Sequence, residues 1–184
     1  MNQFDDYRPS PAWFRHNPYG IHGIGHAGRV FVWANLIGKR LGSKESDRIS
    51  PEVARWAAVL HDVGRISDGI DRGHGDRSAE WILRHRKFLP VSLDDELFDR
   101  LLYCCRMHEV SDEKIGVLSE ELKCIKDADG LDRVRIDDLD PAFLRTEFAR
   151  SLVEPAWTLY GLSKSAEEPW NDIRRSAEGR GWWP

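Results

Sequence analysis

The sequence predicts an all-α fold, a compact bundle of about six to eight helices. Three observations indicate this class: apolar residues recur at helical spacing in several segments, helix-start signals precede some of them, and no stretch has the two-residue alternation of a strand. A chain of 184 residues can bury a substantial core and still form one domain. We therefore expect a single domain over residues 1–184.

The N-terminal part of the chain predicts one irregular segment and one helix. Residues 1–20 are rich in aromatic residues and proline, which favours a segment packed over the domain rather than a disordered tail. Residues 24–41 form the first predicted helix, because His26, Val30, Trp33 and Ile37 share one helical face. The polar residues 42–50 are expected to form a loop.

The second predicted helix has a clear start. Ser50 is suited to the N-cap, Pro51 to the first helical position and Glu52 to the first turn. An apolar face runs along this helix to the adjacent pair His61 and Asp62. Residues 65–75 follow and are rich in glycine and polar side chains, which predicts a loop beside a functional site.

Two more helices are predicted before residue 109. Residues 75–87 should be helical, with Ala79, Ile82 and Leu83 facing the core. Ser92 is the expected cap of the next helix, whose apolar face leads to His108. Residues 109–116 are expected to form a loop.

The C-terminal third predicts two helices and a tail. Leu118, Leu122, Ile125 and Asp129 repeat the same spacing. A last long helix is expected from residues 140–141 to about residue 161, bent near residue 155. Residues 163–184 contain three tryptophans and are expected to form a C-terminal tail.

Composition excludes several classes of function. A net charge of −4 and a pI of about 6.0 give no basic surface for a nucleic-acid polymer. The longest apolar run, residues 30–37, is far too short to span a membrane, and the first residues lack the pattern of a signal peptide. Three cysteines, two of them adjacent, form no disulfide framework. We expect a cytoplasmic protein without membrane or nucleic-acid partners, and its oligomeric state stays open.

Metal-ligating residues coincide with the apolar faces of separate predicted helices. His26, His108 and Asp129 each lie in phase with such a face, and His61 with Asp62 follows a fourth apolar run. A buried His–Asp pair costs free energy unless it is bonded to partners or to a metal. Helical bundles do build metal sites from inward side chains on facing helices.

The ligand types narrow the choice of metal. Imidazoles mixed with carboxylates suit Mn, Fe, Co, Ni or Zn better than Ca, with Mg also allowed, and no paired-cysteine motif indicates a structural zinc site. The phase with Leu122 and Ile125 favours Asp129 rather than Asp127 as the inward ligand. Asp127 is then expected to support the ligands from outside, to meet substrate or to cap a helix.

The order of these residues resembles the HD-domain superfamily of metal-dependent phosphohydrolases, in a small branch of it. The family pattern is a histidine on an early helix, a His–Asp doublet and a later aspartate in an Ala-Asp-x-Leu setting. Here it stands within residues 26–30, 60–65 and 127–133, so the resemblance covers residues 22–133. It implies a compact helical HD-type bundle in which His26, His61, Asp62 and Asp129 bind a catalytic divalent metal.

The resemblance also implies roles for residues outside this set. Some HD proteins hold a second metal with two further histidines, and His74 and His108 stand in the right order; alternatively they contact substrate phosphate or donate protons. Arg65 occupies a place where many relatives have a basic residue that meets phosphate. His22 and Asp71 are assigned to the surroundings of the metals or to substrate. Gly130 departs from the family, in which lysine or arginine is common there.

These expectations lead to one preferred function and two alternatives. The preferred function is metal-dependent hydrolysis of a small phosphorylated substrate such as a nucleotide, with one or two metal ions and with Asp62, Arg65, His74 and His108 as catalytic residues. The first alternative is an HD-fold di-iron oxygenase, which needs all six of these residues as ligands: His26, His61, Asp62, His74, His108 and Asp129. The second is a non-catalytic module that binds a metal or a nucleotide.

Overall fold

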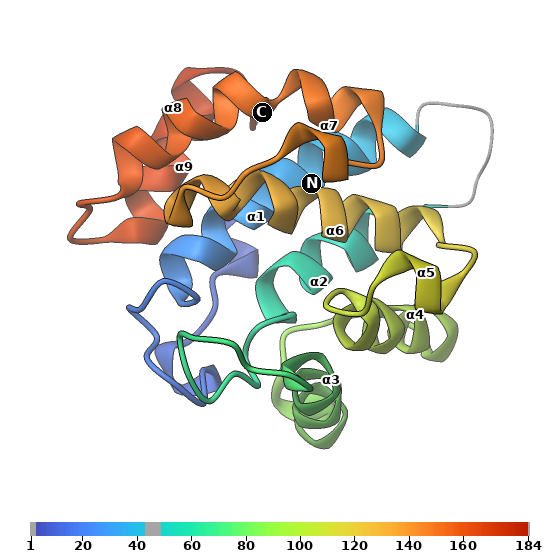
Figure 1. Cartoon of the computed structure of the whole chain (residues 1–184). Coiled ribbons are helices and arrows are strands. Elements are labelled where there is room, and N and C mark those ends of the chain that lie inside the picture. Colours follow the sequence, from blue (N-terminus) through green and yellow to red (C-terminus); the bar gives the residue numbers. More distant parts are fainter. Residues whose placement is uncertain (1–2, 43–48, 184) are drawn as a thin grey trace.

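The computed structural model describes residues 3–42 and 49–183, and every regular element within those ranges is helical (Figure 1). The nine α-helices described are α1 (Ile24–Gly42), α2 (Pro51–Leu60), α3 (His74–His85), α4 (Asp95–Met107), α5 (Asp112–Ile115), α6 (Glu120–Leu131), α7 (Glu147–Ser151), α8 (Val153–Ser163) and α9 (Pro169–Gly179). Two of them, α5 and α7, have only four and five residues. The predicted all-α bundle is confirmed.

Five short 3₁₀ helices connect these elements. They are η1 (Phe4–Tyr7), η2 (Pro11–Trp13), η3 (Arg86–Phe88), η4 (Asp132–Ile136) and η5 (Pro141–Phe143). The η4 helix follows α6 without a break, so it extends the element that carries Asp129 toward the N-terminal end of α1.

Helix α1 is the central element of the bundle. Five successive residues, 30–34, have no exposed surface, so the helix is covered on every side. It packs against α2, α6 and α9, and in Figure 1 it lies between α7–α9 (orange to red) and α2–α4 (teal to green). The first turn of α1, which carries His26, is therefore fixed from several directions.

The N-terminal segment packs on the domain as expected. The rings of Phe4 and Tyr7 are buried against Phe31 of α1, and the Tyr7 hydroxyl donates a hydrogen bond of 2.7 Å to Glu52. The start predicted for α2 is confirmed, because Ser50 Oγ accepts a hydrogen bond of 3.3 Å from Val53 N. The predicted loop at residues 42–50 lies mostly outside the described residues.

The last long helix predicted from residue 141 to residue 161 is wrong. The chain forms η5, an extended stretch, α7 and α8 instead. Buried Asp127 causes the break, since its carboxylate accepts hydrogen bonds from the amides of Arg145 and Thr146 at 2.7 and 2.9 Å. Thr146 then caps α7 through a bond from Ala149 N to its hydroxyl.

The predicted tail contains a helix and part of the core. Helix α9 starts at Pro169 and buries Trp170, whose ring packs against Phe4 and Phe31. Trp183 is buried against Phe31 as well. Trp170 and Trp183, both from the predicted tail, therefore complete the core around α1.

Smaller differences concern the ends and faces of helices. Asp94, not Ser92, caps α4, because its side chain accepts the hydrogen bond from Leu97 N. Leu83 was expected to face the core but is 56% exposed, whereas Ser78 of the same helix is buried. The predicted loop at residues 109–116 includes α5. No helix within the described ranges is long and apolar enough to cross a membrane.

Candidate metal centre

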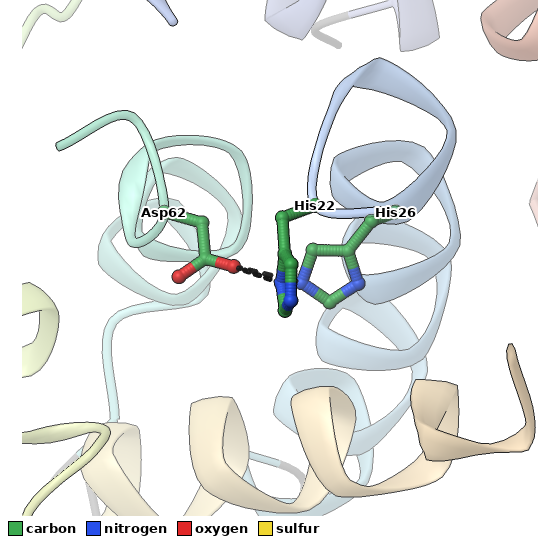
Figure 2. A group of neighbouring side chains, drawn as sticks. All are labelled: His22, His26 and Asp62. Carbon is green, nitrogen blue, oxygen red and sulfur yellow. Dashed lines mark hydrogen bonds and ion pairs between the residues drawn. The ribbon is translucent and has the colours of Figure 1, made fainter. Parts of the chain in front are cut away.

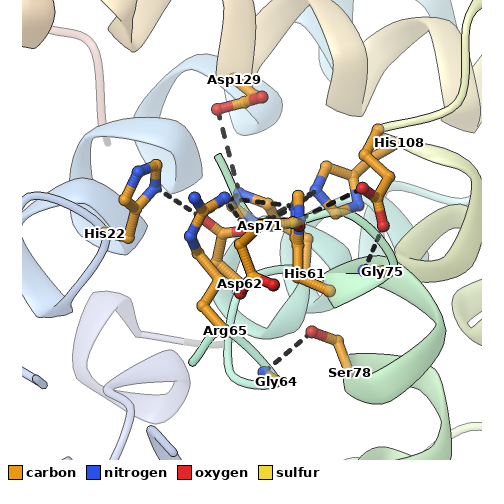
Figure 3. Close-up of polar contacts among 12 residues, drawn as sticks. His22, His61, Asp62, Gly64, Arg65, Asp71, Gly75, Ser78, His108 and Asp129 are labelled. Carbon is orange, nitrogen blue, oxygen red and sulfur yellow. Dashed lines mark hydrogen bonds and ion pairs between the residues drawn. The ribbon is translucent and has the colours of Figure 1, made fainter. Parts of the chain in front are cut away.

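Five helices direct metal-ligating side chains to one point. His26 belongs to the first turn of α1 and Asp129 to the last turn of α6. The doublet follows α2, and His61 is its C-cap; His74 begins α3 and His108 is the C-cap of α4. Figure 3 shows several of these side chains pointing toward one another. The structure thus brings together all six residues that the sequence suggested for a two-metal site.

The histidines form two facing pairs. The Nε2 atoms of His26 and His61 are 3.1 Å apart, and those of His74 and His108 are 2.9 Å apart. Nδ1 of His61, His74 and His108 lies 3.0, 2.6 and 2.7 Å from a backbone carbonyl oxygen, which can only accept a hydrogen bond. In the neutral rings Nδ1 therefore carries the hydrogen, and each Nε2 presents a lone pair to its partner.

Two lone pairs at this distance cannot hydrogen-bond to each other, whereas a cation between them would satisfy both. Asp62 lies between the pairs and offers one oxygen to each. Its Oδ2 is 3.5 Å from His26 Nε2, and its Oδ1 is 3.2 Å from His74 Nε2. Oδ1 is buried without a hydrogen-bond partner among the described residues. These residues therefore fit divalent cations, with Asp62 shared by two ligand sets.

Asp129 completes the set on one side. Its Oδ1 is 3.5 Å from Nε2 of His26 and 4.0 Å from Nε2 of His61. These three residues form one of the compact groups that could hold a metal ion, and His61, Asp62 and His108 form another. We therefore treat His26, His61, Asp62 and Asp129 as the first candidate ligand set, and Asp62, His74 and His108 as the second. A third compact group that could hold an ion is His22, His26 and Asp62.

The protonation states favour cation binding at the first set. Burial lowers the pKa of His26, and it lowers the pKa of His61 to about 3. Burial alone would raise the pKa of Asp62 and of Asp129, but the nearby imidazoles, His61 and His26 foremost, outweigh it and lower both. Neutral imidazoles and ionised carboxylates are the forms that bind metals.

His74 differs from the first pair. Burial lowers its pKa, but the negative charge of Asp62, whose Oδ1 lies 3.2 Å from His74 Nε2, outweighs burial and raises it. The same negative charge would attract a metal cation to this side of Asp62.

Sequence reasoning missed Asp132, which orients His26. Its fully buried Oδ2 is 2.7 Å from His26 Nδ1, and its carboxylate pairs with Arg29 at 2.5 and 3.1 Å. Such a carboxylate fixes the ring so that Nε2 faces the metal. The available signal was spacing, since Asp132 follows Asp129 by three residues and therefore lies one turn further along the same face.

Glu109 was also missed. Its carboxylate accepts hydrogen bonds from the amides of Gly73 and Gly75 at 3.1 and 2.7 Å, and it lies 3.2 Å from His74 Nδ1. A helix N-terminus has free N–H groups that an acid can satisfy. Glu109, adjacent to His108, thereby ties the start of α3 to the end of α4.

Two of the other predicted residues reach the centre. His22 Nδ1 is 2.8 Å from Asp62 Oδ2, and its ring meets the ring of His26 edge-on (Figure 2). The buried Arg65 guanidinium lies 3.8 Å from Asp62 Oδ1, but it also donates to the carbonyls of Ser67 and Gly69. Arg65 therefore holds the loop after the doublet against the Asp62 carboxylate.

Two predicted residues do not reach the centre. The carboxylate of Asp71 accepts a hydrogen bond from Ile66 N at 2.8 Å and pairs with Arg77, so it secures the loop while its backbone carbonyl supports His74. Asp127 faces residues 145–146 and caps the segment that leads into α7. Thr146 itself caps α7, so Asp127 anchors the chain just before that helix.

Two cavities flank the cluster. The first, about 480 Å³, is bounded by His26 together with Arg29 and Arg135. The second, about 330 Å³, lies on the side of His108 and Asp129. Both are within the range of small-molecule sites.

The fold and the cluster define an all-α domain built around a histidine–aspartate site that could hold divalent metal ions. The family model of the HD domain matches residues 23–134, and the chain belongs to this family, the superfamily of metal-dependent phosphohydrolases. The match spans α1 to η4, the part of the chain that carries the ligand sets. A search of curated proteins and a search of solved structures found no match.

Proposed function

We propose that this protein is a metal-dependent phosphohydrolase that acts on a small phosphorylated substrate such as a nucleotide. The observation that supports the proposal is that Asp62 lies between two pairs of facing imidazoles, His26 with His61 and His74 with His108. Divalent ions held there would lower the pKa of a bound water and polarise a phosphoryl oxygen.

The reaction would be hydrolysis of a phosphate ester or anhydride. The oxygen of water forms a bond to phosphorus, the bond from phosphorus to the leaving oxygen breaks, and a proton from the water balances the charge on the leaving group. Asp62 can orient the water as a hydrogen-bond acceptor, and His22 Nδ1, 2.8 Å from Asp62 Oδ2, can hold that carboxylate in place. Arg65 adds positive charge beside the same carboxylate.

The chemistry can be tested by a substrate screen. Phosphate release from nucleotides and phosphomonoesters is measured with Mn, Mg, Co, Ni and Zn, using His61→Ala as the blank. His85→Ala is the matched control, because His85 stacks on Trp81 away from the cluster. Release by the wild type and His85→Ala, but not by His61→Ala, supports the proposal; equal release by His61→Ala would overturn it.

A di-iron oxygenase is the second candidate, because all six residues that such a site needs lie together here. Metal analysis separates the two functions. Two irons per chain with consumption of oxygen would favour the oxygenase, whereas hydrolysis supported by Mn or Ni without oxygen consumption favours the phosphohydrolase. The complete ligand set also counts against a non-catalytic module, in which loss of a member would be expected.

A further inference from the structure

The larger cavity contains a buried guanidinium with incomplete hydrogen bonding. Arg135, on η4, lines the cavity together with His26 of the metal centre. Its side chain is only 6% exposed. Nη1 donates to the carbonyl oxygen of Asp132 at 3.0 Å, but Nε is buried without a partner among the described residues.

The third nitrogen of this guanidinium lacks an acceptor as well. Arg135 Nη2 lies 3.1 Å from Nδ1 of His22, which is also 2.8 Å from Asp62 Oδ2. A carboxylate only accepts hydrogen bonds, so the proton on His22 Nδ1 goes to Asp62, and this nitrogen cannot accept from Arg135. Two donors of a buried guanidinium are thus free beside a predicted metal ligand.

The charges around Arg135 point to an anionic ligand. Arg29 and Arg135 share one buried carboxylate, Asp132, which Arg29 holds at 2.5 and 3.1 Å while Arg135 Nη1 is 3.7 Å away. The closer contacts of Asp132 are with Arg29, so Arg135 has only the longer contact with this carboxylate. Burying an unpaired charge is costly, and the fork of an arginine matches the oxygens of a phosphate group.

The cations around the smaller cavity are already paired. Lys126 lies 3.1 Å from Asp112, Arg145 pairs with Asp112 at 2.8 Å, and Arg133 pairs with Asp138. An anion that entered the smaller cavity would compete with existing ion pairs, whereas an anion at Arg135 would form a new ion pair with that guanidinium. This difference favours the larger cavity for the phosphate.

We propose that Arg135 binds the phosphate group of the substrate, and that the organic part of a hydroxyl-bearing monophosphate ester occupies the larger cavity. This inference rests on the proposed function. The volume of about 480 Å³ suits a sugar or nucleoside. The lining includes the aromatic side chains of Tyr19 and Tyr160, and the carboxylates of Asp68 and Glu167 can accept hydrogen bonds from the hydroxyl groups of the ligand. Arg135 is therefore a substrate-binding residue beside the metal ligands.

Binding of inorganic phosphate to the full Mn²⁺-loaded chain tests the arginine by calorimetry. We expect Arg135→Gln to weaken phosphate binding by about 10- to 100-fold, the loss of hydrogen bonds to a charged group. Arg133→Gln is the matched control, two residues away and directed to the other cavity, and should bind as the wild type does. Arg135→Lys keeps the charge without the fork and should give an intermediate affinity.

The Mn content of each variant verifies that the centre is still formed. Wild-type affinity in Arg135→Gln would overturn the inference, as would loss of binding in Arg133→Gln alone or failure of the wild type to bind phosphate. If Arg135→Gln did not fold, the comparison of Arg135→Lys with the wild type and Arg133→Gln would carry the test, and an unchanged affinity in Arg135→Lys would overturn it.

A second variant tests the cavity. Ala166→Trp fills part of its wall and should weaken binding of adenosine monophosphate and of a hexose monophosphate by about tenfold or more, while phosphate itself binds as before. Equal ester binding in Ala166→Trp and the wild type would contradict this location. If Arg135→Gln hydrolysed substrate with an unchanged KM, the role of Arg135 would be refuted and the proposed function would stand. If phosphate binding depended on Arg135 but no substrate were hydrolysed, the proposed function would be refuted and the role of Arg135 would stand.

Discussion

Replacing Gly75 with alanine is expected to remove the His74–His108 half of the centre and to leave the His26–His61 half in place. A Cβ at residue 75 would lie 2.6 Å from the carbonyl oxygen of Arg106 and 2.8 Å from that of Cys105. Both are backbone atoms of α4, so no side-chain rotation relieves the contact. Ordinary contacts begin at 3.4 Å, so α3 and α4 must separate by about 0.8 Å, the difference between 2.6 and 3.4 Å.

This separation acts on both histidines of the second pair. His74 directly precedes Gly75, and His108 Nδ1 bonds to the Cys105 carbonyl that the new Cβ would strike. Overpacking of this kind costs about 1–3 kcal/mol, and each kcal/mol shifts the Tm of a chain of this size by about 2–4 °C. We therefore expect the Tm to fall by about 2–12 °C.

Equilibrium dialysis against Mn²⁺ with elemental analysis measures the loss, and calorimetry gives the Tm. Gly75→Ala should hold one ion per chain where the wild type holds two. Gly161→Ala is the matched control, because a Cβ there meets nothing within 4 Å in α8 and should change neither quantity. Retention of two ions with wild-type affinity in Gly75→Ala would refute the link between helix spacing and the second ligand set.

Three further outcomes are expected. Asp132→Asn leaves Arg29 buried without its counterion, so the free energy of unfolding, measured by urea denaturation, should fall by about 3–5 kcal/mol. Metal affinity, measured by chelator competition, should fall by about 10- to 100-fold because His26 loses its orienting carboxylate. The exposed control Asp137→Asn should change neither quantity, and wild-type metal affinity in Asp132→Asn would refute the orienting role. Asp129→Ala should lower the number of bound ions. Asp127→Ala should keep that number and lower the free energy of unfolding by about 1–3 kcal/mol, because two partly buried amides lose their acceptor. The opposite result in elemental analysis would reverse the assignment of the two aspartates. Mn²⁺ at a hundred times its Kd should stabilise the chain by about 2.7 kcal/mol, seen as a rise in Tm that a chelator reverses, and a Tm indifferent to Mn²⁺ would count against the centre.

The sequence predicted most of the cluster because the determinants are local. His26 and Asp129 were found from their phase with apolar neighbours on their own helices, and His61 with Asp62 from the apolar run before them. Because α1, α2 and α6 bury their apolar faces, a residue that shares such a face also points into the bundle.

The missed residues depend on contacts between distant segments. Asp132 orients His26 from more than a hundred positions away, and Glu109 reaches the start of a helix 34 residues earlier. The break before α7 has the same origin, since Asp127 lies 18 residues before Arg145 and captures its amide. Helical propensity within residues 141–161 contains no information about that capture.

Helix α9 is a different case, because its signal was present. Pro169 at the first helical position and Trp170, Ile173 and Ala177 on one face predict a helix. The expectation of a tail followed from its terminal position, but burial of Trp170 against α1 stabilises this segment as part of the core.

The most direct test of the account is the number of divalent ions bound per chain by the wild type and by Asp62→Ala. Asp62 contributes one oxygen to each imidazole pair, so its loss should weaken both ligand sets together. We predict two ions for the wild type, two for the control Asp68→Ala, and none retained through dialysis by Asp62→Ala. A wild type without bound ions, or an Asp62→Ala variant that keeps both, would contradict the proposal that Asp62 joins two metal sites.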